Sequence, residues 1–476
     1  MSISFSNNVD IGKDVNSGGG GGGGEANIES LSITPSTSAQ TITASGSVDG
    51  YSPIDVSAVT SSIDANITAS NIKKDVEILG VTGTYEASAP TIIQAVATEM
   101  TAWVLKSDGT LWGAGSAGNG QQGSGNTTNS TNFTKRAENV KKFACSGSTT
   151  WYIDNDDNLY GCGWNVDGAQ GDGTTTKVTS FTKRLENVKD VFVSDWITWA
   201  IKNDDTLWGC GAGTSGQQGS GGTSNVKTFT QRASNVKSVA CSEKTTWYID
   251  TSDNLYGCGY NEYGQQGSGD TTNVTSFTKR LTNVQEVKCW DNLTWALKKD
   301  GTLWGCGSNS RGQQGISTST TYVSSFTQRA SNVDNFDCSD STTWYVNTSG
   351  ELYGCGYGAQ GQQGNNGTSD VTSFTSRATD VSKVACHYNA TWYVKTNTGL
   401  YGCGSNTYGQ QGSGDTTNVT SFTYRAGATE AIIGCANIIW IKKTTGYLWG
   451  CGRNDEGQQA IAKSGIDLTL ITPKAI

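Results

Sequence analysis

Cysteine is the residue type in this chain whose number and spacing most suggest chemistry. Thirteen cysteines occur among 476 residues, and they form two series. The first series stands inside Gly-Cys-Gly triplets and comprises Cys162, Cys210, Cys258, Cys306, Cys355, Cys403 and Cys451. The second series follows valine-rich runs and comprises Cys145, Cys241, Cys289, Cys338, Cys386 and Cys435. Regularly spaced thiols could bind a metal ion or form disulfide bonds.

The residues that replace cysteine in other copies favour packing over chemistry. Ala114 stands in the first series in one copy, and Val193 stands in the second. A small apolar residue can fill a buried thiol position, but it cannot bind zinc or close a disulfide. The total is odd, and no Cys-x-x-Cys pair has zinc spacing. We therefore expect free core thiols, no metal site and synthesis in a reducing cytoplasm.

Other residues that could carry catalysis form no recognisable constellation. The single histidine, His387, lies where other copies have Ser146, Glu243 or Asp340, so we expect it at a variable surface position without a triad. A carboxylate pair for glycoside hydrolysis could form only in space, and no Asp or Glu is singled out. The Gly-Gln-Gln-Gly segments lack the Gly-Lys-Ser/Thr of a phosphate-binding loop. We expect a protein that is not an enzyme and has no cofactor.

These residues belong to a repeat that must position them. A Leu-Trp-Gly or Leu-Tyr-Gly triplet recurs every 48 residues, with one interval of 49. Its eight copies begin at Leu111, Leu159, Leu207, Leu255, Leu303, Leu352, Leu400 and Leu448. A fixed period of this length indicates a repeat architecture.

Each triplet lies in the second strand of a predicted hairpin. In the fifth copy two apolar runs flank Lys299-Asp300-Gly301, and this loop places Ala296 opposite Trp304 and Trp295 opposite Gly305. Across the copies, a larger residue at one position of the first pair is accompanied by a smaller residue at the other, as expected for side chains that face each other. Four copies pair tyrosines: Tyr152 with Tyr160, Tyr248 with Tyr256, Tyr345 with Tyr353 and Tyr393 with Tyr401. Four pair a smaller residue with tryptophan: Val104 with Trp112, Ala200 with Trp208, Ala296 with Trp304 and Ile441 with Trp449.

The whole repeat predicts an all-β propeller. Both hairpin faces are apolar, so each hairpin must lie between other sheets. A valine-rich run and a Phe-Thr-x-Arg run complete four strands, with the recurring arginine in a structural role. Eight copies predict eight four-stranded blades, with seven as the alternative. The chain ends on Ile471-Thr472-Pro473-Lys474 and the propeller begins with Ile92 to Ala97, so we expect N- and C-terminal strands to close one blade that contains both Val96 and Pro473.

Three segments follow from this pattern. Residues 1–30 form a flexible arm that includes the glycines from Gly18 to Gly24, residues 31–90 form a small β-rich module, and residues 91–476 form the propeller. In the module we expect strands around 54–59 and 78–81 and a helical turn near 70–74. The net charge of −9 and the absence of a basic stripe argue against nucleic-acid binding. Without an 18-residue apolar run or a signal peptide, we expect no membrane insertion.

Two resemblances bear on function. The segment from Leu255 to Gly269 resembles the regulator of chromosome condensation repeat, whose propellers usually have seven blades and serve functions from guanine-nucleotide exchange to protein inhibition. The histidine usual in that family is replaced by Thr150, Thr246 and Thr343. Residues 31–90 are similar to short modules in tail and fibre proteins of bacteriophages that infect gut bacteria, although an ordinary β-rich cap on the propeller is the alternative.

The leading hypothesis is therefore a bacteriophage virion structural protein, a tail fibre or receptor-binding protein assembled in the host cytoplasm. Residues 1–90 would bind other tail proteins in a homo-oligomeric assembly, and the propeller would attach to a host-surface receptor, either a polysaccharide or a protein. One alternative is a glycan-degrading tail enzyme. The other is a cellular protein-binding regulator of the chromosome-condensation-repeat type.

Binding would use the loops that vary most between copies. In an antiparallel blade the first and third loops share one face. Aromatic rings beside Asp and Glu suit sugars, because sugars offer C–H faces and hydroxyls. The candidate residues are Asp195, Trp196, Glu243, Trp290, Asp291, Asp340, His387, Tyr388, Tyr260 and Tyr263. Sequence drift in loops that bind nothing is the competing explanation.

Overall fold

The chain divides into two compact units, Met1–Ala89 and Pro90–Ile476. The computed structural model describes residues 40–42, 54–56, 68–72, 74–78, 81–82, 84, 90–387, 389–435, 437–460 and 468–474. Among the described residues of the first unit, β1 (Gln40–Ile42) pairs with β2 (Ile54–Val56), and β3 (Glu77–Ile78) pairs with β4 (Val81–Thr82). A short 3-10 helix, η2, spans Ala69–Asn71. Ile78 and Val81 lie opposite each other in a hairpin, so the single strand expected there is wrong.

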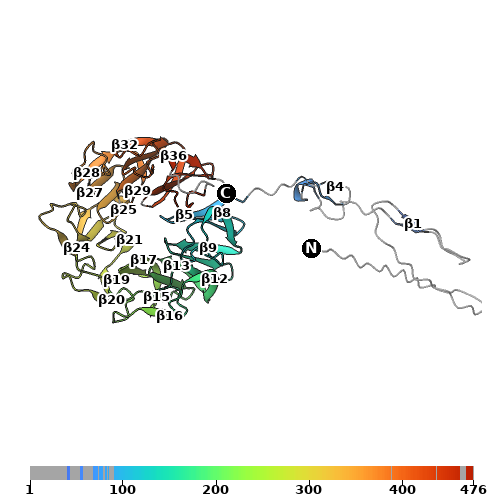
Figure 1. Ribbon diagram of the computed structural model, residues 1–476, viewed down its shortest axis with the longest axis horizontal. Coiled ribbons are helices and arrows are strands. Elements are labelled where there is room, and N and C mark those ends of the chain that lie inside the picture. The colour runs from blue at the N-terminus through green and yellow to red at the C-terminus, as the bar shows by residue number, and fades with distance from the viewer. Residues whose placement is uncertain are drawn as a thin grey trace, which may run out of the picture. The chain divides into compact units, whose positions relative to one another are not determined.

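The second unit is a ring of eight four-stranded antiparallel sheets (Figure 1). Blades 1 to 4 contain β5 (Ile92–Ala97), β6 (Thr101–Lys106), β7 (Leu111–Gly115), β8 (Ser130–Ala137); β9 (Val140–Cys145), β10 (Thr149–Asp154), β11 (Leu159–Gly163), β12 (Val178–Leu185); β13 (Val188–Val193), β14 (Ile197–Lys202), β15 (Leu207–Gly211), β16 (Val226–Ala233); and β17 (Val236–Cys241), β18 (Thr245–Asp250), β19 (Leu255–Gly259), β20 (Val274–Leu281).

Blades 5 to 8 contain β21 (Val284–Trp290), β22 (Leu293–Lys298), β23 (Leu303–Ser308), β24 (Tyr322–Ala330); β25 (Val333–Cys338), β26 (Thr342–Asn347), β27 (Leu352–Gly356), β28 (Val371–Ala378); β29 (Val381–His387), β30 (Ala390–Lys395), β31 (Gly399–Gly404), β32 (Val419–Ala426); and β33 (Thr429–Cys435), β34 (Ile438–Lys443), β35 (Leu448–Gly452), β36 (Leu468–Pro473). The all-β fold and the count of eight blades are thus confirmed. No helix in the described part of the chain is long and apolar enough to cross a membrane.

The register predicted for the central hairpins is confirmed in every blade. Ala296 faces Trp304 and Trp295 faces Gly305, and the other seven copies pair in the same way. In the tyrosine copies the two rings stack, as in Tyr248–Tyr256 with centroids 4.7 Å apart. In the tryptophan copies a lysine lies over the ring, as Lys298 does over Trp304 at 5.0 Å. Both arrangements fill the same volume on the sheet surface.

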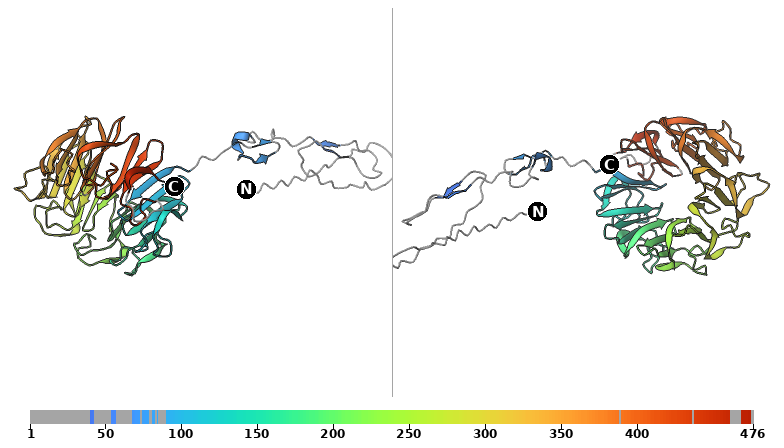
Figure 2. Two further views of the ribbon diagram at one scale, coloured as in Figure 1. Left: turned by 45° about the horizontal axis from the view of Figure 1, so that its top comes forward. Right: turned by 180° about the vertical axis from the view of Figure 1, so that it is seen from behind.

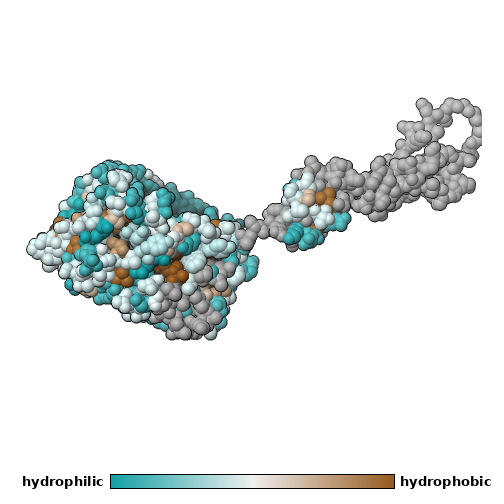
Figure 3. Space-filling model, turned by 90° about the horizontal axis from the view of Figure 1, so that it is seen from above, coloured by the Kyte–Doolittle hydropathy of each residue, from teal (hydrophilic) through white to brown (hydrophobic). Residues whose placement is uncertain are grey.

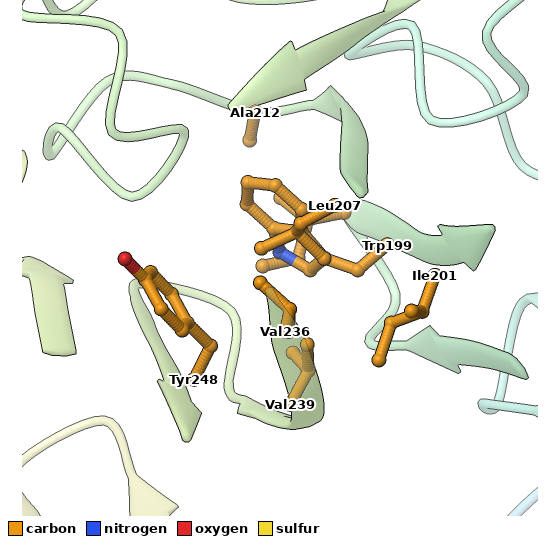
Figure 4. Packing of buried hydrophobic residues seen from close by; sticks show 8 residues of the cluster. Trp199, Ile201, Leu207, Ala212, Val236, Val239 and Tyr248 are labelled. Carbon is orange, nitrogen blue, oxygen red and sulfur yellow. The ribbon is translucent and has the colours of Figure 1, made fainter. Parts of the chain in front are cut away.

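A fully buried tryptophan holds each blade against the next. Trp199 packs with Ile201 and Leu207 of blade 3 and with Val236 and Tyr248 of blade 4 (Figure 4). The facing glycine is needed because a Cβ atom at Gly209 would approach the Trp199 ring to 2.3 Å. The hydrophobic core is therefore a ring of clusters between blades.

The predicted closing blade with strands from both ends of the chain is wrong. Val96 lies in β5 of blade 1, and Pro473 lies in β36 of blade 8, in a separate sheet. The reason is that the repeat is in phase with the blade, since each unit begins with its inner strand and ends with its outer one. The ring instead closes by packing of the last blade against the first, which lie side by side in Figures 1 and 2.

Candidate binding face

The loops predicted to share a face do share one. In each blade we call the connection between the first and second strands the AB loop and that between the third and fourth strands the CD loop; together they form the AB–CD face. Gln265 in the CD loop of blade 4 donates from Nε2 to the carbonyl oxygen of Asp291 in the AB loop of blade 5 (2.7 Å). Gln313 and Asp340 repeat this contact one blade later (3.2 Å). The same contact is made from blades 1, 3 and 8, so in most blades the CD loop supports the next AB loop.

The Gly-Gln-Gln-Gly motif therefore has a structural role that was missed from the sequence. The backbone carbonyl of Gln265 also accepts a hydrogen bond from the Cys306 thiol of blade 5 (3.2 Å). The second glutamine, Gln266, donates to the carbonyl oxygen of Cys258 in its own blade (2.9 Å). Recurrence of the motif in nearly every blade was the available signal, because a residue needed at every blade junction must repeat with the blades.

The twelve cysteines whose side chains the structure describes are buried or half-buried, and they are free thiols. Burial raises the pKa of Cys306 well above its ordinary value, which makes it a poor nucleophile. Cys435 was wrongly assigned to the second cysteine series. Gly434 pairs with Ile439 as Cys289 pairs with Thr294, so Cys435 stands one residue further along. Within the described residues, no group of three or more His, Cys, Asp or Glu is placed to hold a metal ion.

An arc of carboxylates lines the inner part of the AB–CD face. They are Glu99, Asp195, Glu243, Asp291 and Asp340, from the AB loops of blades 1, 3, 4, 5 and 6. Four were candidates from the sequence, whereas Glu99 was missed because it precedes the first complete Leu-Trp-Gly unit. We call these five residues the acidic arc.

Few cations of the ring compensate the acidic arc, and only Lys244 acts against the raised pKa of Glu243. Burial, with a smaller contribution from Asp291, raises the pKa of Asp340 to about 6 and also raises that of Glu243. Burial raises the pKa of Glu99 as well, although Arg453 partly opposes it. Within the described residues none of the five forms an ion pair, and one buried oxygen each of Asp291 and Asp340 accepts no hydrogen bond. Such groups are costly to bury unless a partner supplies the missing contacts.

The aromatic candidates divide into two sets. Tyr263 is 41% exposed on a CD loop, and Tyr260 beside it is covered by Lys244, whose Nζ lies 5.2 Å from the ring centroid. Trp196 is half-buried against the core between blades 3 and 4, and Trp290 is half-buried against the core between blades 5 and 6. Tyr388 lies outside the described residues. The structure therefore places Tyr260, Tyr263 and Trp196 in loops of the AB–CD face, with Trp196 half-buried there, and places Trp290 at the end of strand β21.

His387 and Trp290 line the central channel. A cavity of about 780 Å³ runs between the inner strands of the ring and is lined by both residues. Trp290 donates from Nε1 to the carbonyl oxygen of Cys338 (2.7 Å), and the His387 ring meets the Trp290 ring edge to face at 5.0 Å. Burial lowers the pKa of His387 to about 4. The expectation of a surface histidine is wrong, because the inner strand β29 continues through residue 387 and keeps its side chain in the channel wall.

A buried ion pair completes this part of the channel. Lys288 Nζ lies 2.9 Å from Asp337 Oδ1, and Asp337 Oδ2 accepts the backbone N–H of Cys386 (2.8 Å). Lys288 and Asp337 occupy the same position of the first strand in their blades, and the other six blades have Val, Ala, Phe or Ile there. These charges are satisfied by one another and by the backbone, so they brace blades 5, 6 and 7.

No protein-family model matches the sequence, and no curated protein sequence matches it. Solved structures do share the fold. Human WBSCR16 has a TM-score of 0.52 at 19% identity, covering 64% of this chain and 87% of that one. Prp20p from Saccharomyces cerevisiae has a TM-score of 0.53 at 17% identity, covering 73% and 91%. A second yeast RCC1 (Prp20) structure, bound to Kap60, has a TM-score of 0.52 at 17% identity, covering 76% and 94%.

The shared feature is the RCC1-type propeller fold. At these identities the likeness extends to the fold alone, and the resemblance of the repeats to the chromosome-condensation type is confirmed at that level. Function must then come from the site itself. On the side of the ring that Figure 3 shows, the exposed apolar residues form separate small patches.

Proposed function

We propose that this chain is a non-catalytic binding protein whose AB–CD face holds a positively charged protein partner. The observation that carries the proposal is the acidic arc, in which Glu99, Glu243 and Asp340 have raised pKa values and none of the five carboxylates forms an ion pair within the described residues. Two structures of the same fold support a protein partner: one describes the binding properties of Prp20p to Gsp1p and histones, and the other has yeast RCC1 bound to Kap60. This function agrees with the protein-binding regulator expected as an alternative.

The geometry suits lysine or arginine side chains that project from the partner. A cation entering beside Glu243, Asp291 and Asp340 would supply the contact that one buried oxygen each of Asp291 and Asp340 lacks. Around the acidic arc, Met100, Val166 and Tyr263 are 39%, 53% and 41% exposed on loops of the same face. They provide apolar contacts beside the charged centre. Binding of this kind should be fast and should weaken with salt.

Fluorescence anisotropy with a labelled peptide rich in lysine and arginine tests the proposal, with a glutamate-rich peptide of equal length as the comparison. The double variant Glu243→Gln, Asp291→Asn should weaken binding of the basic peptide at least about tenfold, because two desolvated charge contacts are lost. The matched control is Asp204→Asn, Asp300→Asn, two exposed carboxylates in the loops on the opposite side of the ring. The control should bind within about twofold of the unaltered protein. Equal losses in both variants, or equal binding of both peptides, would contradict the proposal.

Attachment to a host surface as part of a virion tail stays a prediction, as do homo-oligomerisation and assembly in a host cytoplasm. The virion-tail prediction rests on residues 31–90, most of which lie outside the described residues, and the structural neighbours do not support it. A glycan-degrading activity has no catalytic pair in the acidic arc that the geometry singles out. Antibody labelling of intact phage particles would separate the first hypothesis from the proposed function, because a regulator would be absent from the particles.

A further inference from the structure

Neighbouring blades are joined by a polar contact that recurs around the ring. At the junction of blades 3 and 4, the Cys258 thiol donates to the carbonyl oxygen of Gln217 (3.4 Å). The hydroxyl of Thr246 donates to the same oxygen (2.9 Å) and accepts from Trp199 Nε1 (3.2 Å). The thiol contact is also made by Cys162, Cys210, Cys306, Cys355, Cys403 and Cys451, each to the preceding blade.

The junction of blade 8 with blade 1, which we call the seam, has lost these groups. Ala114 stands where the other blades have the donating cysteine, and its partner across the hairpin, Ala102, stands where blade 4 has Thr246. Neither methyl group can donate to the preceding blade. The seam keeps two polar contacts between loops: Gln458 Nε2 donates to the carbonyl oxygen of Glu99 (2.9 Å), and Asn129 Nδ2 donates to Glu456 Oε2.

The inner strands show the same loss. Gln94 joins blade 1 to the carbonyl oxygen of Phe143 in blade 2 (2.8 Å), and Lys383 joins blade 7 to that of Glu430 in blade 8 (3.1 Å). The corresponding residue of blade 8 is Ala431, which has no polar side chain to offer blade 1. The seam is therefore held mainly by apolar packing of Phe133 against Trp440, at 5.7 Å between centroids.

A buried lysine weakens this packing further. Lys474 replaces the arginine that ends the outer strand of the other blades, and its side chain is only 6% exposed. Its Nζ lies 5.8 Å from the centre of the Trp440 ring and has no hydrogen-bond partner. Burial lowers the pKa of Lys474 to about 7, because a charged ammonium group at this position is costly in free energy.

We propose that the ring opens at the seam, through separation of blade 8 from blade 1 while the other seven junctions stay closed. No strand crosses the seam, so opening breaks no sheet hydrogen bond. The chain enters blade 1 through Pro90 and Thr91, directly before β5.

Hydrogen exchange of the full chain, read by mass spectrometry, tests this opening. Opening removes the neighbouring blade that supports the sheets of blades 1 and 8, so their strands should unfold locally more often. Backbone amides of β6 and β34, the second strands of blades 1 and 8, should therefore exchange faster than those of the equivalent strands β14 and β18 at the junction of blades 3 and 4. The variant Ala102→Thr, Ala114→Cys restores the missing donors and should slow exchange at the seam by at least about fivefold. The matched control Thr246→Ala, Cys258→Ala removes them from blade 4 and should raise exchange in β14 and β18 by a similar factor.

Two results would overturn the proposal. The first is exchange in β6 and β34 of the unaltered protein that is no faster than in β14 and β18. The second is an unchanged exchange rate at the seam in the variant Ala102→Thr, Ala114→Cys, when circular dichroism shows that this variant is folded. If that variant does not fold, Lys474→Met provides the test, because removing the buried ammonium group should also slow exchange at the seam, and an unchanged rate there would contradict the proposal.

Discussion

Two groups of carboxylates on opposite sides of the ring have pKa values that are shifted in opposite directions. On the face formed by the loops between second and third strands, which we call the BC face, Asp157 accepts from Lys141 (2.7 Å) and from Asn203 of the next blade (2.9 Å). Asp253 is paired with Lys237 and Lys299 in the same manner. These side-chain hydrogen bonds lower the pKa of both aspartates. On the AB–CD face, burial raises the pKa of Glu99, Glu243 and Asp340.

The two groups therefore differ in whether their charge stabilises the ring. Those on the BC face are matched by lysines of the same ring, so their charge is satisfied before any partner arrives. Glu99, Glu243 and Asp340 of the acidic arc oppose the ring's own stability, since burial and, to a smaller extent, repulsion from neighbouring carboxylates disfavour their charged form. A group that costs stability is best explained by what it meets in a complex.

The largest effect should come from a residue that belongs to neither face. Trp290→Ala should destabilise the ring by about 3 kcal/mol, because it empties a channel-wall position and leaves the Cys338 carbonyl without its donor. Thermal unfolding followed by circular dichroism measures the loss. Tyr263→Ala is the control, since Tyr263 is exposed on the open face and its removal should leave the thermal midpoint unchanged. An unchanged thermal midpoint for Trp290→Ala would contradict the placement of Trp290 in the channel wall and favour a position on the AB–CD face.

A smaller effect, of opposite sign, is expected within the acidic arc. The pKa of Asp340 is raised to about 6, so the folded state holds this proton more tightly than the unfolded state does. Its contribution to stability is therefore largest below about pH 4 and declines as the pH rises through 6. Asp340→Asn should remove that decline and stabilise the ring at pH 8 by on the order of 1 to 2 kcal/mol.

The measurement is a series of urea denaturation curves of both proteins between about pH 4 and 8. The two should converge at the acidic end, because Asp340 is then neutral in the folded protein. A constant difference at every pH would show that the amide acts through packing and not through charge.

The smallest effect is expected for Asp253→Asn on the BC face. The lowered pKa of Asp253 means that its ion pairs stabilise the ring at neutral pH and lose this contribution as the pH falls through its folded value. Because both lysine contacts are exposed to solvent and screened by salt, the thermal midpoint at neutral pH should fall by no more than about one degree. Scanning calorimetry at low and high salt should show the difference shrinking as salt is added. A large effect that persists in salt would contradict the contrast between the two faces.

The fold could be predicted in detail because the repeat supplies its own controls. Eight independent volume exchanges set the hairpin register, and Ala114 or Val193 in a cysteine position excluded a ligand role for the thiols. The acidic arc could be predicted in part, because Asp195, Glu243, Asp291 and Asp340 occupy equivalent loop positions. Trp290 and His387 were misplaced, since the repeat does not show where an inner strand extends beyond its usual end. The closing blade was mistaken because the strand content of the two ends fits both a shared blade and two complete ones.

The in-phase arrangement of repeat and blade has an evolutionary consequence. Each unit of about 48 residues folds into a complete sheet, so a recombination event that adds or removes one unit leaves every remaining sheet with its four strands. A ring closed by a shared strand lacks this freedom, because its first and last units must be inherited as a matched pair. Lineages that carry this architecture should therefore differ in the number of their units more readily than in the design of any one unit, and the ring size becomes a heritable variable in its own right.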